Sequence, residues 1–320
     1  MSDYFLGVDG GQSSTIAVIG DETGHIAGWA SAGPCNHVGA AEGRAKFLRV
    51  MRECVAQAAK RARLPVEGRM KFKAACLGMS GGPDDKAVLL AELIDAERLL
   101  VTHDARIAWA GATEAEPGVI VIAGTGSIAY GENAQGESAR AGGWGFIYGD
   151  EGGAFDIARH ALRAVLREHE GWGPRTALTP AIVEATGAEN ANDAMHRLYT
   201  TEWPRVRVAE LAMTVDRIAE EGDPVAGDIL RQAAQQLAML AGSVRQQLFS
   251  DELVTPIHIS WIGGVFQSRI LLERFRTLAL LGGGSEGIPP KHSPAAGALM
   301  LAYRAAGLRI LPHPIVGIKS

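Results

Sequence analysis

The chain has 320 residues, 47% hydrophobic and 21% charged, a composition that excludes intrinsic disorder. Its net charge of −5, with scattered basic residues, gives no electrostatic footprint for nucleic acid, so we expect no such partner. No apolar run approaches the ~20 residues of a membrane span, and the first residues predict a strand rather than a signal peptide. The three cysteines show no CxxC spacing, which argues against a disulfide framework or metal cluster and favours a cytoplasmic protein.

The first part of the chain predicts an α/β domain. Apolar residues recur at helical spacing over residues 41–62, where Phe47, Met51 and Cys54 would lie on one face. The remaining predicted elements are strands at 4–9, 14–20, 25–30 and 73–79, a helix at 84–95, and a strand RLLVTHD that ends at Asp104. A boundary between two domains is expected near residues 110–118, in the sequence GATEAEPG.

The second part begins with a similar strand–turn–strand pattern and then becomes mainly helical. Its predicted elements are a hairpin at 119–131, amphipathic helices at 154–168, 206–221 and 225–249, a buried strand at 256–264, a loop at 282–290 and an Ala/Gly-rich helix at 294–306. The return of the strand–glycine turn–strand pattern suggests a structural duplication.

Two glycine-rich turns are the main functional signal. Residues 4–18 and 119–131 each place small and hydroxyl residues between two apolar runs, where backbone N–H groups can form an anion-binding concavity. Neither turn leads directly into a helix as a Rossmann GxGxxG would, and no GxxxxGK[ST] string exists. We therefore expect phosphate-binding hairpins, with hydroxyl donors at Ser13, Ser14, Thr15 and Thr125. Ordinary hairpin turns are the alternative.

Two aspartates end predicted strands. Asp9 enters the first glycine turn, and Asp104 ends the strand RLLVTHD. Phosphoryl transfer to a hydroxyl needs a Mg²⁺-associated carboxylate and a second carboxylate that accepts the hydroxyl proton. These two aspartates are the candidates, with Asp104 as the base. The alternative for Asp104 is a cap for a helix that starts at Ala105.

A second glycine-dense loop contains further candidates. Asp150 and Glu151 could cap the following helix, or could accept hydrogen bonds from sugar hydroxyls. Trp144, flanked by glycines, is a candidate platform for an apolar ligand face, with hinge packing as the alternative. Asn36 follows a Gly-Pro-Cys loop and is a common turn residue. The nine histidines show no HxxxH or HExxH spacing, which argues against zinc.

Together these motifs resemble the N-acetylglucosamine kinase family, within the BadF/BadG/BcrA/BcrD-type ATPases of the sugar kinase/actin superfamily. The resemblance runs from residue 4 to about residue 306, and GGWGFIYGDEGG is its most discriminating piece for sugar kinases. The ordered motifs are VDGG (8–11), PCNHVG (34–39), LGMSGG (77–82), THDA (102–105), IAGTGS (122–127), GGWGFIYGDEGG (142–153) and IGGV (262–265).

The resemblance implies two ribonuclease-H-like domains, residues 1–117 and 118–293, with ATP and sugar in the cleft between them. The helix 294–306 would return to the N-terminal domain. It implies Asp104 as catalytic base and Asp9 as the Mg²⁺-associated carboxylate. The implied sugar contacts are Asn36, Ser80, Asp104, Trp144 and Asp150. The implied nucleotide contacts are Gly10, Gly11, Gln12, Ser13, Ser14, Thr125 and Gly126, with Gly263 and Gly264 on the adenosine side.

The first loop departs from the family pattern, which commonly reads DGGGT followed by a basic residue. Gln12 adds a side chain where glycine is usual, and Ser14 lacks the positive charge expected near the phosphates. The loop would still bind ATP through its backbone. The effect of these two residues on ATP affinity is open.

The expected activity is ATP-dependent phosphorylation of the 6-hydroxyl of an amino sugar, N-acetylglucosamine first. Glucosamine, N-acetylmannosamine and N-acetylmuramic acid remain alternatives, because a few loop atoms decide among them. An alternative from a different functional class is a reductase-activator-like ATPase, which would drive a conformational change in a partner protein. A sugar-binding regulator without catalysis is a third alternative. Such regulators often carry a helix-turn-helix, and we expect none before the first strand. Related kinases are often homodimers. Residues 170–205, which contain GWGPRTALTP and TTEWPR, match no assigned motif and are expected to border the sugar pocket.

Overall fold

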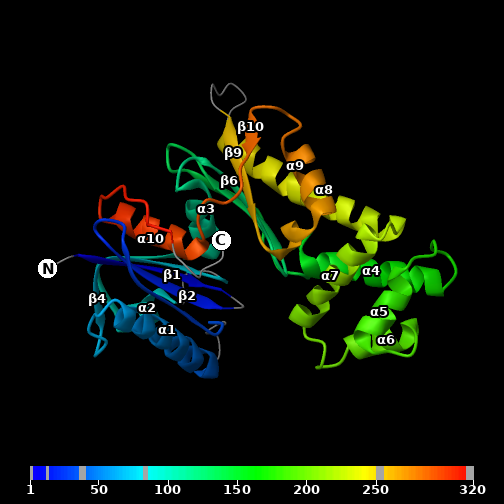
Figure 1. Cartoon of the computed structure of the whole chain (residues 1–320), viewed down its shortest axis with the longest axis horizontal. Helices are drawn as coiled ribbons and strands as arrows, with labels where there is room; N and C mark the ends of the chain where they lie inside the picture. The colour runs from blue at the N-terminus through cyan, green and yellow to red at the C-terminus, as the bar shows by residue number, and fades with distance from the viewer. Residues whose placement is uncertain (1–2, 12–13, 36–40, 82–85, 250–255, 315–320) are drawn as a thin grey trace. The chain divides into compact units, whose positions relative to one another are not determined.

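The structure is a computed structural model. It describes residues 3–11, 14–35, 41–81, 86–249 and 256–314. Two compact units make up the chain: Met1–Pro117 with Pro289–Ser320, and Gly118–Ile288 (Figure 1). Among the described residues, no helix has the length and apolar character needed to cross a lipid bilayer.

The first unit is built on a mixed sheet with strand order β3-β2-β1-β4-β5. Its strands are β1 (Tyr4–Gly10), β2 (Thr15–Asp21), β3 (Ile26–Ala32), β4 (Met70–Met79) and β5 (Ile94–His103). The first three form an antiparallel meander, whereas β4 and β5 run parallel to β1. The carboxyl ends of β1, β4 and β5 therefore meet at one edge of the sheet.

Helices cover both faces of this sheet (Figure 1). They are α1 (Ala41–Arg61), α2 (Ala87–Leu93), α3 (Asp104–Thr113) and α10 (Pro294–Ala305). The apolar stripe of α1, with Phe47 and Met51 fully buried, packs with Leu6 and Val8 from one face of β1. Strand residues alternate between faces, so Gly7 points to the opposite side, where α10 packs.

The contact between α10 and β1 is close because Gly7 has no side chain. A Cβ at Gly7 would collide with the backbone of Ala295 and Leu299 in α10. At the other end of the helix, the Tyr303 ring lies 4.7 Å from that of Phe5, and its hydroxyl donates to the carbonyl of Asp21 at 2.8 Å. These contacts make a helix from the end of the chain part of the first unit.

The second unit contains another five-stranded sheet, in the order β10-β9-β6-β7-β8. Its strands are β6 (Gly118–Ala123), β7 (Ser127–Glu132), β8 (Ser138–Gly142), β9 (Ile257–Ile262) and β10 (Ser285–Gly287). An antiparallel meander of β6, β7 and β8 is extended by β9 parallel to β6 and β10 parallel to β9. Both sheets thus begin with a hairpin that contains a glycine turn.

The helices of the second unit are α4 (Ala154–His169), α5 (Leu178–Thr186), α6 (Ala191–Leu198), α7 (Arg205–Glu220), α8 (Pro224–Leu248) and α9 (Arg269–Ala279), with a 3₁₀ turn at Gly264–Gln267. The long helix α8 packs on β6, β7 and β8 and contacts α7 and α9. Helices α4 to α7 form a layer beside it (Figure 1). The core of the unit lies between α8 and the sheet, with Val119, Val121 and Leu237 fully buried.

Two predicted elements differ from the structure. The helix expected over 84–95 ends at Leu93, and Ile94 begins β5 because its backbone pairs with Met70 of β4. The loop expected over 282–290 contains the short strand β10, which pairs with β9. In both cases pairing with a neighbouring strand outweighs the local pattern.

Candidate active site

Three of the predicted site segments meet at the carboxyl edge of the first sheet. The strand register places Gly10 beside Met79 and Met79 beside His103. Asp9, Ser80 and Asp104 therefore lie at the ends of three adjacent parallel strands. This edge is where open α/β sheets commonly bind ligands.

Ser80 connects these three strand ends. Its backbone N–H donates to the carbonyl of Gly10 at 3.1 Å, and its hydroxyl donates to Oδ2 of Asp104. The other oxygen of Asp104 accepts the N–H of Ala105 at 2.9 Å, at the start of α3. The Asp104 carboxylate thus has both oxygens engaged at a helix N-terminus, where the helix dipole favours negative charge.

Lys86 reaches the same loop from the start of α2. Its ammonium donates to the carbonyl of Ser80 at 3.2 Å, although the residue is only 1% exposed. A buried lysine is uncommon, since removing its charge from water is costly. No sequence pattern points to Lys86, because an isolated lysine before an apolar helix usually indicates a solvated position.

The carboxyl group of Asp9 is half-buried and lies within electrostatic range of Asp104. Burial, together with the negative charge of Asp104, raises the pKa of Asp9 to about 7. A carboxyl group whose pKa is raised by burial and by a neighbouring carboxylate is a common feature of catalytic sites. A bound cation would favour the ionised form of Asp9.

The first glycine turn joins β1 to β2. Gly11 donates to the carbonyl of Ser14 at 3.0 Å, which closes the turn. A Cβ at Gly10 would collide with the sulfur of Met79, so the backbone here approaches the end of β4 closely. The predicted contacts Gln12, Ser13 and Asn36 lie outside the described residues.

The second glycine turn, between β6 and β7, packs on the N-terminus of α4. The N–H groups of Ala154 and Phe155 donate to the carbonyls of Gly124 and Thr125 at 2.8 and 3.1 Å. Gly126 lies at the end of this turn, where its N–H precedes β7. The turn is therefore positioned by a helix that would otherwise have unsatisfied N–H groups.

The turn after β9 lies next to this one. Because β9 is parallel to β6, with Ile262 beside Ile122, their carboxyl ends share an edge. Gly263 has a φ of 117° and lies so close to the Ala123 carbonyl that a Cβ would collide with it. The structure thus brings Gly263 next to Ala123 and Gly124, where the β6–β7 turn begins.

Asp150 lies against the second glycine turn, between β6 and β7. The residue is buried and its φ is 63°, a left-handed conformation uncommon for aspartate. A Cβ on Gly126 would collide with its carboxylate, which also lies 3.5 Å from the N–H of Ser127. Helix α4 has no side-chain cap, so the capping alternative is wrong for Asp150. Its carboxylate instead accepts a hydrogen bond from Arg205 at 2.5 Å.

Trp144 lies in the loop after β8, which begins where Gly143 donates to the carbonyl of Ser127 at 3.0 Å. Its side chain is 66% exposed, and the Arg140 guanidinium lies 4.7 Å from a ring centroid. The indole is not part of the hydrophobic core of the second unit. The ring is available as a platform for a ligand.

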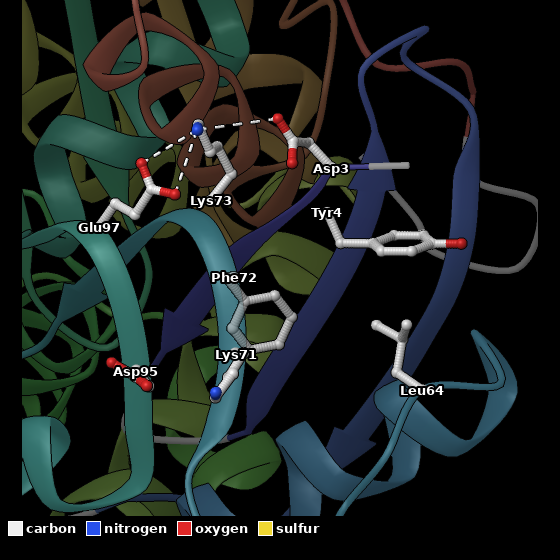
Figure 2. A pocket seen from close by; sticks show the side chains of 8 residues that line it. All are labelled: Asp3, Tyr4, Leu64, Lys71, Phe72, Lys73, Asp95 and Glu97. Atoms are coloured by element: carbon white, nitrogen blue, oxygen red, sulfur yellow. Dashed lines mark hydrogen bonds and ion pairs between the residues drawn. The ribbon is translucent and has the colours of Figure 1, made fainter. Parts of the chain in front are cut away.

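A pocket elsewhere in the first unit is separate from these residues. It has a volume of about 580 Å³ and is lined by Asp3, Tyr4, Leu64, Lys71, Phe72, Lys73, Asp95 and Glu97 (Figure 2). Most of these residues lie at or near the starts of β1, β4 and β5, whereas Asp104 follows the end of β5. Lys73 pairs there with Glu97 at 3.0 Å and with Asp3 at 3.9 Å.

Comparison with known proteins agrees with these motifs. The model of the BadF/BadG/BcrA/BcrD ATPase family matches residues 6–302. The chain is 30% identical over 306 residues to an N-acetylmuramic acid/N-acetylglucosamine kinase of Clostridium acetobutylicum, covering 93% of this chain and 98% of the relative. It is 28% identical over 319 residues to an N-acetyl-D-glucosamine kinase of Dictyostelium discoideum, covering 95% and 98%.

Solved structures have the same fold. A Chromobacterium violaceum protein assigned as an N-acetylglucosamine kinase is 26% identical with a TM-score of 0.74, covering 94% of this chain and 99% of that one. A glucokinase of the ROK family from Streptomyces griseus, at 18% identity and a TM-score of 0.54, covers 94% and 99%. The expected α/β fold of the actin-like ATPases is confirmed. The chain belongs to the BadF/BadG/BcrA/BcrD ATPase family.

Proposed function

We propose that the protein transfers the γ-phosphoryl group of ATP to the 6-hydroxyl of an amino sugar, with N-acetylglucosamine as the first candidate. The observation that carries the proposal is the presence of two neighbouring carboxylates, Asp9 and Asp104, at the carboxyl edge of the first sheet, with Asp104 held by Ser80. The kinases of Clostridium acetobutylicum and Dictyostelium discoideum, to which nearly the whole chain is similar, support the sugar class.

Asp104 is the proposed base. The hydroxyl of Ser80 and the N–H of Ala105 hold its carboxylate in one orientation. A carboxylate fixed in this way can accept the proton of a sugar hydroxyl that lies within hydrogen-bond distance. The same interaction would align the hydroxyl oxygen for attack on the γ-phosphorus.

Asp9 is the proposed partner of Mg²⁺. In kinases this ion is typically bound by one or two carboxylates together with the phosphates of ATP, rather than by a cage of protein ligands. The described residues contain no group of three or more metal-ligating side chains, and the adjacent Asp9 and Asp104 fit the former type of site. When bound, Mg²⁺ would neutralise charge on the phosphates.

The two glycine turns are the proposed phosphate contacts, through Gly10, Gly11, Ser14, Thr125 and Gly126. Backbone N–H groups at such turns bind phosphate oxygens without the cost of ordering long side chains. Gly263 and Gly264 would contact the adenosine. Trp144 and Asp150, with Ser80, would contact the sugar. Gln12, Ser13 and Asn36 remain predicted contacts from the sequence.

The experiment is a coupled assay of ADP release with Mg·ATP against a panel of hexoses and amino sugars. We expect a sugar-dependent rate confined to amino sugars, with N-acetylglucosamine fastest. Asp104→Asn should lower kcat by about 10²–10⁴-fold with little change in ATP binding, because the amide cannot accept the proton. Near-normal turnover in this variant would exclude Asp104 as the base, and sugar-independent ATP hydrolysis would overturn the kinase assignment.

The cysteines count against the alternative of a reductase-activator-like ATPase. An iron–sulfur cluster shared between subunits needs accessible thiolates. Cys35, Cys54 and Cys76 are all buried, and burial raises the pKa of Cys54 and Cys76 to about 12. These thiols are placed as core residues. A colourless purified protein is the corresponding expectation.

A further inference from the structure

Arg205 is the partner of the buried carboxylate that the proposed function assigns to the sugar. It is the first residue of α7 and follows Pro204, in the segment TTEWPR that matched no motif. Its Nη2 lies 2.5 Å from Oδ2 of Asp150. The Asp150 side chain is 8% exposed and that of Arg205 is 28% exposed, so the ion pair is largely shielded from solvent.

Two aromatic rings hold the guanidinium in place. Its central carbon lies 4.8 Å from the ring centroid of Phe146 and 5.7 Å from that of Phe155. The two rings pack edge to face against each other with centroids 5.2 Å apart. Cation–π contact with both rings fixes the guanidinium plane and limits its rotation. Arg205 is therefore a pre-organised donor rather than a mobile surface side chain.

Asp150 is fixed from the other side. Its left-handed backbone places the carboxylate directly on Gly126, at the end of the second glycine turn. Among the described residues, the other hydrogen bond to this buried carboxylate comes from the N–H of Ser127. At 3.5 Å it is a long hydrogen bond, so Arg205 is the main partner of Asp150. A carboxylate has about four acceptor positions, so the contacts with Arg205 and Ser127 leave positions for hydroxyl donors of a ligand.

We propose that Arg205 is a positioning residue for amino sugar binding: it holds the Asp150 carboxylate in the orientation that accepts sugar hydroxyls. This inference rests on the proposed function. It assigns a role to the helical layer α4–α7, which supplies both the guanidinium and one of the two rings that fix it. Because Arg205 acts through Asp150, its loss should weaken sugar binding much more than ATP binding.

The test compares Arg205→Met and Arg205→Lys with Arg207→Met as a matched control. Arg207 lies two residues along α7, 4.1 Å from the ring centroid of Trp203, and donates to the carbonyl of Glu202 at 2.8 Å. We expect Arg205→Met to raise KM for N-acetylglucosamine about tenfold or more, with KM for ATP within about twofold of wild type. Arg205→Lys should rescue part of the loss, and Arg207→Met should behave as wild type.

A double-mutant cycle with Asp150→Asn distinguishes an effect of Arg205 through Asp150 from a general structural effect on the sugar KM. If Arg205 acts through Asp150, Arg205→Met should have little further effect on sugar KM in the Asp150→Asn background. The rise in Tm caused by N-acetylglucosamine without ATP should follow the same pattern. If Arg205→Met does not fold, Arg205→Lys is compared with Arg207→Lys in the same two measurements.

Several outcomes would overturn the inference. One is a sugar KM in Arg205→Met equal to that of Arg207→Met. Others are a loss shared equally by sugar and ATP, or effects of Arg205→Met and Asp150→Asn that multiply independently. Wild-type protein is measured first, so a failure of the proposed function is seen separately. If wild type phosphorylates no amino sugar, the proposed function and this inference both fall.

Discussion

The hydroxyl of Ser80 donates a hydrogen bond to Oδ2 of Asp104, and this contact joins the loop after β4 to the start of α3. The Ser80 N–H bonds to Gly10 at 3.1 Å, so the same residue also ties the loop to the end of β1. The position of the proposed base thus depends on a serine outside its own helix. The Ser80 hydroxyl orients the carboxylate because it donates to Oδ2 of Asp104, while Oδ1 accepts the N–H of Ala105.

Ser80→Ala should therefore lower kcat while changing KM for ATP little. Loss of the hydroxyl frees the carboxylate to rotate, and a misplaced base costs roughly ten- to a hundredfold in rate. Steady-state kinetics with N-acetylglucosamine and Mg·ATP measure the effect. Ser31→Ala, at an exposed position in β3, is the control and should match wild type. An unchanged kcat in Ser80→Ala would show that the hydrogen bond does not orient the base.

Gly126→Ala and Gly124→Ala form a matched pair in the second glycine turn. A Cβ at Gly126 would collide with the Asp150 carboxylate, whereas a Cβ at Gly124 meets no atom within 4 Å. We expect Gly126→Ala to lower the free energy of unfolding by about 1–3 kcal/mol, as overpacking does, and Gly124→Ala to change it little. Denaturant unfolding compares the two. Equal stabilities would show that Asp150 moves aside without cost.

The elements with a strong local pattern could be predicted from the sequence. The helix expected over 41–62 is α1 (Ala41–Arg61), and the one expected over 225–249 is α8 (Pro224–Leu248). Apolar residues at a 3.6-residue period specify such helices by themselves. The β1–β2 hairpin could be predicted too, because its apolar strands flank a turn of small residues. The β1–β2 hairpin places the first glycine turn.

Other elements depend on partners distant in the sequence. Strand β8, SARAG, contains small and half-exposed residues and is specified by pairing with β7 rather than by its own pattern. The Arg205–Asp150 ion pair joins residues 55 positions apart, and no local sequence pattern predicts which charged side chains will pair over such a distance. The only local signal for Arg205 was its place after Pro204 at a helix start.

Lys86→Met should destabilise the protein. The ammonium of this buried lysine donates to the Ser80 carbonyl, and methionine fills similar space without a donor. Losing a hydrogen bond from a charged donor costs about 1.5–3 kcal/mol of unfolding free energy. Lys73→Met is the control, because Lys73 forms its ion pairs at the surface (Figure 2), and its change should be much smaller. Similar losses in both variants would contradict a special role for Lys86.

The raised pKa of Asp9 makes stability depend on pH. The group has a pKa of about 7 in the folded protein and 3.8 as its ordinary value, so between these values the folded state binds the extra proton. The free energy of unfolding should then fall as pH rises from about 4 to 7, by at most about 1.4 kcal/mol for each pH unit from this group. Its stabilising contribution is complete below pH 4 and is lost above pH 7.

Asp9→Asn removes this titration without changing the shape of the side chain. We expect the variant to be more stable than wild type at pH 7.5, and the difference between the two to shrink as the pH is lowered toward 4. Urea unfolding at several pH values measures it. Adding Mg²⁺ and a nonhydrolysable ATP analogue should favour the ionised carboxylate, since a bound cation lowers the pKa of its ligand. The pH dependence of wild type should then flatten, while that of Asp9→Asn should not change. A pH profile identical in both proteins would mean that Asp9 ionises normally and that the burial of its carboxyl has no energetic consequence.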